Sequence, residues 1–134
     1  MAGNYQSVLI VDDDVEFNQL VACNLRNDGF RVFQAFNGVE AVELAKKKQP
    51  SVILLDIMMP VMDGYDVLRE LKTDKKTKDL PVFMFSAKSL MKDVEEALST
   101  GADDYISKET EPDDLGRVIR VKLDNVAQEA NAHN

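Results

Sequence analysis

Short apolar runs alternate with longer amphipathic segments along this chain of 134 residues, and few folds accommodate such a pattern. The runs 8–11, 52–55 and 82–85 are almost wholly aliphatic or aromatic, as expected of strands buried on both faces. Stretches with apolar residues at helical spacing follow them. The alternation predicts an α/β fold, in which helices cover both faces of a doubly wound, five-stranded parallel sheet.

The remaining boundaries come from turn and capping residues. We expect the other two strands at 31–35, a less apolar edge strand, and at 105–107. Five helices are expected. Asp14 and Asp63 are N-caps that mark the starts of the first and third helices, and the turn Asn37-Gly38 precedes the second. The fourth helix is expected near 92–100, and the fifth begins at Pro112, a residue favoured in a first turn. We expect the polar segment 73–79 to be a solvated loop and residues 127–134 to be a frayed tail.

Composition restricts the classes of partner and the compartment. The formal net charge of −8 disfavours direct binding to nucleic acid or to an anionic membrane. No apolar run approaches the roughly 18 residues of a membrane span, and the first residues do not resemble a signal peptide. The single cysteine, Cys23, excludes an internal disulfide, and we expect it to be buried or half-buried. These features favour a cytoplasmic location.

Polar side chains stand where the apolar runs end. They are Asp12 and Asp13 after the first run, Asp56 after the third, Ser86 after the fourth and Lys108 after the fifth. In an open α/β sheet, ligands bind beyond the carboxyl ends of the strands, so these residues should converge. Three carboxylates placed close together repel one another, and a hard divalent cation relieves that repulsion. Phosphoryl transfer with a divalent cation is the leading chemistry for this set.

The loop after Asp56 carries a resemblance to a known family. The run DIMMPVMDG at 56–64 resembles the phosphoacceptor loop of bacterial response-regulator receiver domains, which act in two-component signal transduction. The acidic pair, the hydroxyl after the fourth run and the segment GADDYISK match the same family in order and spacing. The resemblance covers roughly residues 7–126 and is strongest to single-domain, chemotaxis-type regulators. It implies a flavodoxin-like sheet of order 2-1-3-4-5 in one receiver domain spanning residues 1–134.

The resemblance also implies a metal site and a phosphoacceptor. Asp56 would be the nucleophile that accepts a phosphoryl group from a sensor histidine kinase or a histidine phosphotransfer protein. Mg²⁺, with Mn²⁺ as an alternative, would be held by Asp12, Asp13, Asp56 and the main-chain carbonyl of Met58. Lys108 would pair with the phosphoryl oxygens. The chain would act as a signalling switch rather than an enzyme, with weak hydrolysis of its own aspartyl phosphate.

Two further residues would form the switch in such a domain. Ser86 would turn inward to bond a phosphoryl oxygen, and Tyr105 would move from an outward to an inward position. The surface of the fourth helix, fifth strand and fifth helix would then change for a downstream protein target or the output domain of a longer chain. The sequence leaves open whether the domain stands alone and whether it dimerises.

One position departs from the family's usual sequence, and a second lies where the family varies the rate of hydrolysis. The family usually has proline after the lysine, often with a cis bond, whereas Glu109 follows Lys108 here. The sequence leaves that bond open as cis or trans. Met58 stands two residues after Asp56, where the family tunes hydrolysis, and a bulky side chain there could shield a phosphoryl group from water.

Three other functions are alternatives to the receiver-domain interpretation. A magnesium-dependent phosphatase would usually have a second acid two residues after its nucleophile, where this chain has Met58. A flavin-binding module would need a phosphate loop after the first strand, where this chain has Asp12, Asp13 and Asp14. A degenerate receiver that only acts as a scaffold would lack some of the acceptor-site side chains, all of which are present.

Overall fold

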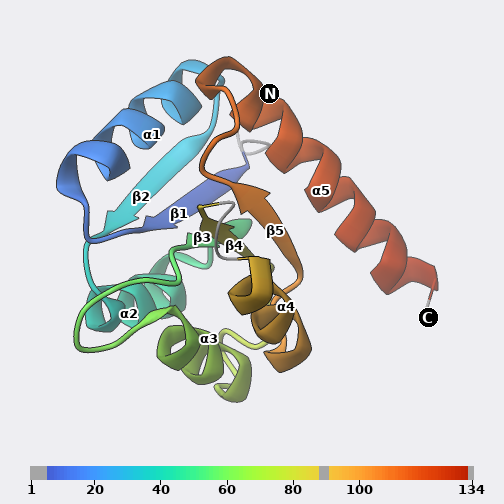
Figure 1. Ribbon diagram of the computed structural model, residues 1–134. Coiled ribbons are helices and arrows are strands. Elements are labelled where there is room, and N and C mark those ends of the chain that lie inside the picture. The colour runs from blue at the N-terminus through green and yellow to red at the C-terminus, as the bar shows by residue number, and fades with distance from the viewer. Residues whose placement is uncertain (1–5, 88–90, 133–134) are drawn as a thin grey trace.

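The chain folds into one five-stranded parallel sheet with helices on both faces (Figure 1). The computed structural model describes residues 6–87 and 91–132. The sheet order is β2-β1-β3-β4-β5, and every neighbouring pair is parallel. The strands are β1 Ser7–Val11, β2 Arg31–Ala35, β3 Val52–Leu55, β4 Val82–Ser86 and β5 Asp104–Ser107. The predicted fold class, strand order and edge position of β2 are confirmed.

Five helices connect and follow the strands. They are α1 Val15–Asn27, α2 Gly38–Lys48, α3 Gly64–Thr73, α4 Met91–Thr100 and α5 Pro112–Ala132. Each helix begins near the carboxyl end of the strand before it, because a parallel sheet needs a crossover that returns the chain to its starting edge. None of the helices in the described part of the chain is long and apolar enough to span a membrane.

Side-chain capping fixes where three of these helices begin. The carboxylate of Asp14 accepts a hydrogen bond from the Phe17 N–H, and Asn37 caps α2 in the same way through Glu40. Asp63 and Asp66 form a reciprocal capping box at the start of α3. The N-cap roles predicted for Asp14 and Asp63 are therefore confirmed, and the starts of α1 and α3 are set by local interactions.

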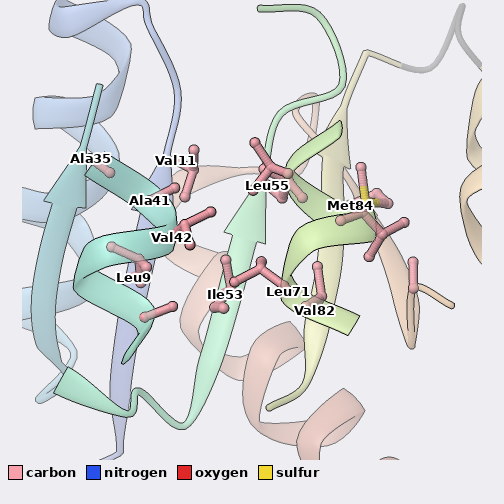
Figure 2. Packing of buried hydrophobic residues seen from close by; sticks show 14 of the residues in the cluster. Leu9, Val11, Ala35, Ala41, Val42, Ile53, Leu55, Leu71, Val82 and Met84 are labelled. Atoms are coloured by element: carbon pink, nitrogen blue, oxygen red, sulfur yellow. The ribbon is translucent and has the colours of Figure 1, made fainter. Parts of the chain in front are cut away.

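Two hydrophobic layers hold the sheet, one on each face. On one face α1 and α5 pack Val21, Leu25 and Ile119 against β-strand residues such as Ile10 and Leu54. On the other face α2, α3 and α4 cover the sheet. Figure 2 shows side chains of this second layer, with Ala41, Val42 and Leu71 directed from the helices toward Ile53 and Leu55 on β3. Both faces of the central strands are thus fully buried, as their continuous apolar sequences predict.

The segment 73–79 is not simply a solvated loop. It forms turns, and Thr77 within it is completely buried. The Thr77 hydroxyl donates a hydrogen bond of 2.6 Å to the carbonyl of Leu71, near the end of α3. Lys46 of α2 also pairs with Asp74 at 3.1 Å. Sequence polarity misled the prediction, because threonine can satisfy a carbonyl inside a fold as readily as it can face water.

Two other expectations are corrected by the structure. α5 continues to Ala132, through most of the segment expected to be frayed, and its last turns are rich in alanine, the strongest helix former. Cys23 is exposed rather than buried or half-buried. Residues 133–134 lie outside the described residues.

The buried hydroxyl of Thr77 generates a first prediction. Thr77→Val keeps the shape of the side chain but leaves the Leu71 carbonyl without this donor, so the free energy of unfolding should fall by about 1–2 kcal/mol. Thr73→Val is the matched control, because Thr73 donates to carbonyls of the same helix at an exposed site. Its effect should stay within about 0.5 kcal/mol. Urea unfolding of both variants measures the difference, and equal losses would contradict the role of Thr77.

Candidate functional site

Three carboxylates meet where β1 and β3, the neighbouring central strands, end. Asp12 and Asp13 follow Val11, and Asp56 follows Leu55; the N–H of Asp56 donates to the Val11 carbonyl at 3.0 Å. One carboxylate oxygen from each aspartate lies within 4.8 Å of the others. Asp12 and Asp56 are buried, whereas Asp13 is exposed. The structure thus brings together the three acids that the strand-end pattern predicts.

The buried side-chain amide of Asn18 forms a hydrogen bond with the backbone of Asp12. The Asn18 Nδ2 atom donates to the Asp12 carbonyl at 3.1 Å and to the Ala35 carbonyl at 3.0 Å. Gln34 completes the network by donating to Asn18 Oδ1 at 3.1 Å. Asn18 is completely buried on α1, so this network ties the ends of β1 and β2 together. It fixes the direction in which the acidic pair leaves the sheet.

Sequence reasoning missed Asn18, although a signal was present. Asn18 lies three, four and seven residues before Val21, Ala22 and Leu25, which are all buried on the inner face of α1. A polar residue at such a position needs hydrogen-bond partners inside the fold. The partners of Asn18 are backbone carbonyls at the ends of β1 and β2, where the acidic pair begins.

Lys108 reaches into the carboxylate cluster from the end of β5. Its Nζ atom lies 2.7 Å from Asp12 Oδ2 and 3.4 Å from Asp56 Oδ1. Its backbone N–H donates to the Ser86 carbonyl at 2.9 Å, which anchors the lysine beside the end of β4. The Lys108–Glu109 peptide bond is trans, which answers the question left open by the missing proline. The lysine predicted from GADDYISK therefore lies in the site.

Burial and charge shift the proton affinities of this cluster. Burial raises the pKa of Asp56 to about 6; the charge of Lys108 opposes this shift, and that of Asp12 adds to it. Burial alone would lower the pKa of Lys108, but its hydrogen bond to Asp12 and the charges of Asp56 and Asp12 raise it overall. The ammonium group therefore stays charged, while burial disfavours the charged form of Asp56.

The loop between β3 and α3 turns close to Asp56. The Gly64 N–H donates to the Ile57 carbonyl at 2.9 Å. A Cβ atom on Gly64 would lie 2.7 Å from Ile57 Cα and closer still to the Asp56 carbonyl oxygen. Only glycine allows this approach, which brings the start of α3 next to the acidic cluster.

Met58 stands at the mouth of the site. Its N–H donates to Asp56 Oδ1 at 3.3 Å, and its side chain is 63% exposed. The position two residues after Asp56 thus carries an apolar side chain in place of a second acid. The predicted use of its carbonyl as a metal ligand stays a prediction.

The two hydroxyls predicted to form a switch are both buried. Ser86 is the last residue of β4 rather than the first after it, and its side chain is completely buried. Neither Ser86 Oγ nor the Tyr105 hydroxyl has a hydrogen-bond partner among the described residues. Tyr105 packs at the edge of the layer formed by α2, α3 and α4, so its hydroxyl is not directed outward. Their roles in switching stay predictions.

The donor set fits a hard divalent cation. Carboxylate oxygens are the ligands that Mg²⁺ takes in proteins, and it commonly keeps several waters. Among the described residues, the three carboxylates face a single ammonium group, that of Lys108, which forms ion pairs with Asp12 and Asp56. Exposed Asp13 leaves one side of the cluster open to solvent. The cluster of Asp12, Asp13 and Asp56 can therefore hold a metal ion.

Comparison with known sequences places the site in context. The model of the response regulator receiver domain matches residues 8–120. The chain is 37% identical over 116 residues to the DNA-binding dual master transcriptional regulator RpaA of Synechocystis sp., covering 87% of this chain and 48% of that protein. It is 35% identical over 129 residues to the probable transcriptional regulator ycf27 of Porphyridium aerugineum, covering 96% and 52%. The chain thus spans about half the length of these curated relatives.

Solved structures share the same architecture. The chemotaxis response regulator CheY4 of Vibrio cholerae superposes with a TM-score of 0.81 at 28% identity, covering 89% of this chain and 99% of that chain. A response regulator structure from Chloroflexus aurantiacus gives a TM-score of 0.82 at 30% identity, covering 90% and 98%.

The raised pKa of Asp56 generates a pH-dependent prediction. Because the folded-state pKa lies above the usual value of 3.8, the contribution of Asp56 to stability is complete below pH 4 and is lost as the pH rises through about 6. Asp56→Asn removes the buried charge, so it should stabilise the metal-free protein by about 1 kcal/mol or more at pH 8. The gain should shrink toward pH 4.

Urea unfolding at pH 4, 6 and 8 in the presence of a chelator measures this gain. Asp79→Asn is the control, because Asp79 is exposed, and its effect should not vary with pH. A destabilisation by Asp56→Asn that is the same at pH 4 and pH 8 would show that Asp56 carries no unfavourable buried charge.

Proposed function

The chain belongs to the response regulator receiver domain family of two-component systems, and on that premise we propose that it is a phosphorylation-activated switch whose phosphoacceptor is Asp56. One observation carries the assignment. Asp56 is the carboxylate at the centre of the site, with Asp12 on the neighbouring strand end and the Lys108 ammonium 3.4 Å away. Receiver domains are signalling proteins and not enzymes in the ordinary sense.

The hydrogen bonds favour Asp56 over Asp12, the other buried acid, as the nucleophile. Asp12 is engaged at both oxygens, since Oδ1 accepts from the Asp14 N–H and Oδ2 from Lys108. Asp56 Oδ1 accepts from Met58 and faces Lys108, whereas no hydrogen bond to Oδ2 occurs among the described residues. Asp56 therefore has an oxygen available for attack.

In the proposed transfer, an Asp56 oxygen attacks the phosphorus of a phosphohistidine on a histidine kinase or phosphotransfer protein. A carboxylate oxygen–phosphorus bond forms and the phosphorus–nitrogen bond breaks. The electron pair of the broken bond stays on the imidazole nitrogen of the donor. Because the transferring group carries its charge on three oxygens, positioning and charge neutralisation supply most of the catalysis.

Asp12, Asp13 and Asp56, with the main-chain carbonyl of Met58, would hold Mg²⁺ beside the acceptor, and Mn²⁺ is the alternative ion. When bound, the ion neutralises charge on the phosphoryl oxygens. Lys108 contributes a compact positive charge from the end of β5, at the same edge of the sheet. Its ammonium group would exchange its contact with Asp56 for a phosphoryl oxygen while its backbone stays hydrogen-bonded to Ser86.

Ser86 and Tyr105 are proposed to carry the signal away from the site. Ser86 Oγ is a buried hydroxyl without a partner among the described residues, so a phosphoryl oxygen on Asp56 would satisfy it. Tyr105 lies two strand positions before Ser107, which pairs with Ser86 across β4 and β5. Movement at Ser86 would then change the packing of Tyr105 and the surface formed by α4, β5 and α5.

The downstream partner is proposed to be a protein target or an output domain of a longer chain. The relatives named above are transcriptional regulators, and RpaA binds DNA, but the chain spans about half of their length. Its own charge of −8 disfavours direct contact with nucleic acid or an anionic membrane. A cytoplasmic location is the natural setting for such a switch.

Phosphorylation of the protein by acetyl phosphate tests the proposed function. With Mg²⁺, intact mass should increase by one phosphoryl group, and the gain should disappear in a chelator. Asp56→Asn should abolish the gain, whereas Asp79→Asn, which removes an exposed carboxylate, should leave it unchanged. An equal gain in the Asp56→Asn protein would place the acceptor elsewhere.

The exposed side chain of Met58 generates a prediction about lifetime. Met58 lies at the mouth of the site and can cover a phosphoryl group on Asp56 against water. In Met58→Asn a polar side chain could instead orient water, so the phosphorylated form should decay about three- to tenfold faster, which equals about 0.6–1.4 kcal/mol in the barrier. Decay of the labelled protein measures this rate. Val61→Asn, a change at an exposed position farther along the same loop, should leave the lifetime unchanged.

A further inference from the structure

We propose that Phe17 is a positioning residue for Lys108, and that its ring is a neutral platform from which the ammonium group can move between the carboxylates and a phosphoryl group. The inference rests on the proposed function of Asp56. It adds a residue of α1 to a site otherwise formed by residues at the strand ends.

The geometry places the ring under the ammonium group. Lys108 Nζ lies 4.9 Å from the centroid of the Phe17 ring, within the range of a cation–π interaction. Phe17 is the third residue of α1 and is half-buried. Its backbone N–H is also the donor to the Asp14 cap, so the residue is fixed at the first turn of the helix.

A second aromatic ring fixes the orientation of the platform. The rings of Phe17 and Phe85 are 5.7 Å apart with an interplanar angle of 31°. Phe85 is almost completely buried in β4 and directly precedes Ser86. The aromatic pair therefore links α1 to the strand whose end holds the backbone of Lys108. Lys108 is thus positioned at its backbone by Ser86 and at its ammonium group by Phe17.

The neutrality of the ring matters because the other partners of Lys108 are anions. Its ion pairs within the described residues are with Asp12 and Asp56. A carboxylate in place of the Phe17 ring would form a further ion pair with the ammonium group. That ion pair would have to break before the ammonium group could move to a phosphoryl oxygen. The ring attracts the charge without forming an ion pair, and it shields one side of the group from water.

The cleft beside the ring contains other carboxylates that the Lys108 ammonium group could contact. A cleft of about 280 Å³ lies beside it, lined by Phe17, Phe85 and Lys108 together with Glu109 and Glu111. These two glutamates are competing carboxylates for the ammonium group. An attractive ring on this side of the lysine favours the position near Asp56 over an excursion toward the glutamates.

The test weakens the ring's attraction for cations without changing its shape. Phe17 is replaced by 3,4,5-trifluorophenylalanine, and the initial rate of labelling by acetyl phosphate with Mg²⁺ is measured. The rate should fall about two- to fivefold, the size expected for a partly exposed cation–π contact. Phe17→Tyr, which keeps the ring, should stay within about twofold of the parent, and Phe17→Leu should be at least as slow as the fluorinated protein.

The matched control is the same fluorination at Phe33. That ring lies on the edge strand β2, 5.4 Å from Lys48 Nζ, and takes no part in the site. Fluorination of Phe33 should leave the labelling rate unchanged. A similar slowing by fluorination of either ring would overturn a specific role for Phe17.

A second readout needs neither metal nor phosphoryl donor. Fluorination of Phe17 should lower the ratio of folded to unfolded protein about two- to fivefold in the parent, and this effect should vanish in a Lys108→Met background. An effect of equal size in both backgrounds would mean that the ring acts only through packing. The platform would then be excluded.

The outcomes separate this inference from the proposed function. If the parent is labelled at Asp56 and the fluorinated protein reacts equally fast, the role of Phe17 is wrong and the phosphoacceptor stands. If the parent is not labelled by any donor, the proposed function fails and the positioning role fails with it.

Discussion

The ammonium group of Lys108 makes it possible to bury Asp12 and Asp56 side by side. Two carboxylates removed from water at the ends of adjacent central strands would repel each other, and each would lose its hydration. Lys108 bonds to the first and faces the second, and its own backbone is hydrogen-bonded to the end of β4. The balance is incomplete, because burial still raises the pKa of Asp56 to about 6. Three carboxylates share one ammonium group among the described residues where the proposed cation and phosphoryl group would bind.

The site depends on supports that contribute no chemistry themselves. Asn18 holds the backbone of Asp12, and Gly64 lets the loop after Asp56 pass close to its carbonyl. Ser86 accepts the backbone N–H of Lys108 while its own hydroxyl is left without a partner among the described residues. The backbones of Asp12 and Lys108 are therefore fixed by hydrogen bonds that do not involve their carboxylate and ammonium groups. Such an arrangement suits a switch, in which contacts must exchange without loss of the fold.

The sequence was sufficient to predict the sheet and the acids at its edge, because both follow from simple repeats. Continuous apolar runs indicate central strands, and polar residues directly after them must lie at one edge of a parallel sheet. Partners are harder to predict. Asn18 looks like an ordinary polar residue of a helix until its neighbours Val21 and Leu25 are known to be buried, and Thr77 looks like a residue of a solvated loop. In both cases the partner is a backbone carbonyl, of Asp12 and Ala35 for Asn18 and of Leu71 for Thr77, that comes within reach only when the chain folds.

The way each helix begins at the same edge of the sheet has a further effect. Peptide dipoles align along a helix, so its first turn carries a partial positive charge. α1 and α5 start at Val15 and Pro112, soon after Asp13 and Lys108 in the sequence. α3 starts at Gly64, which packs closely against the backbone of Asp56. The backbone therefore provides a fixed positive field around the acids, independent of any one side chain. A phosphoryl group with two negative charges would be attracted by these helix starts. Because the attraction comes from the backbone, substitution of individual side chains could weaken it without abolishing it.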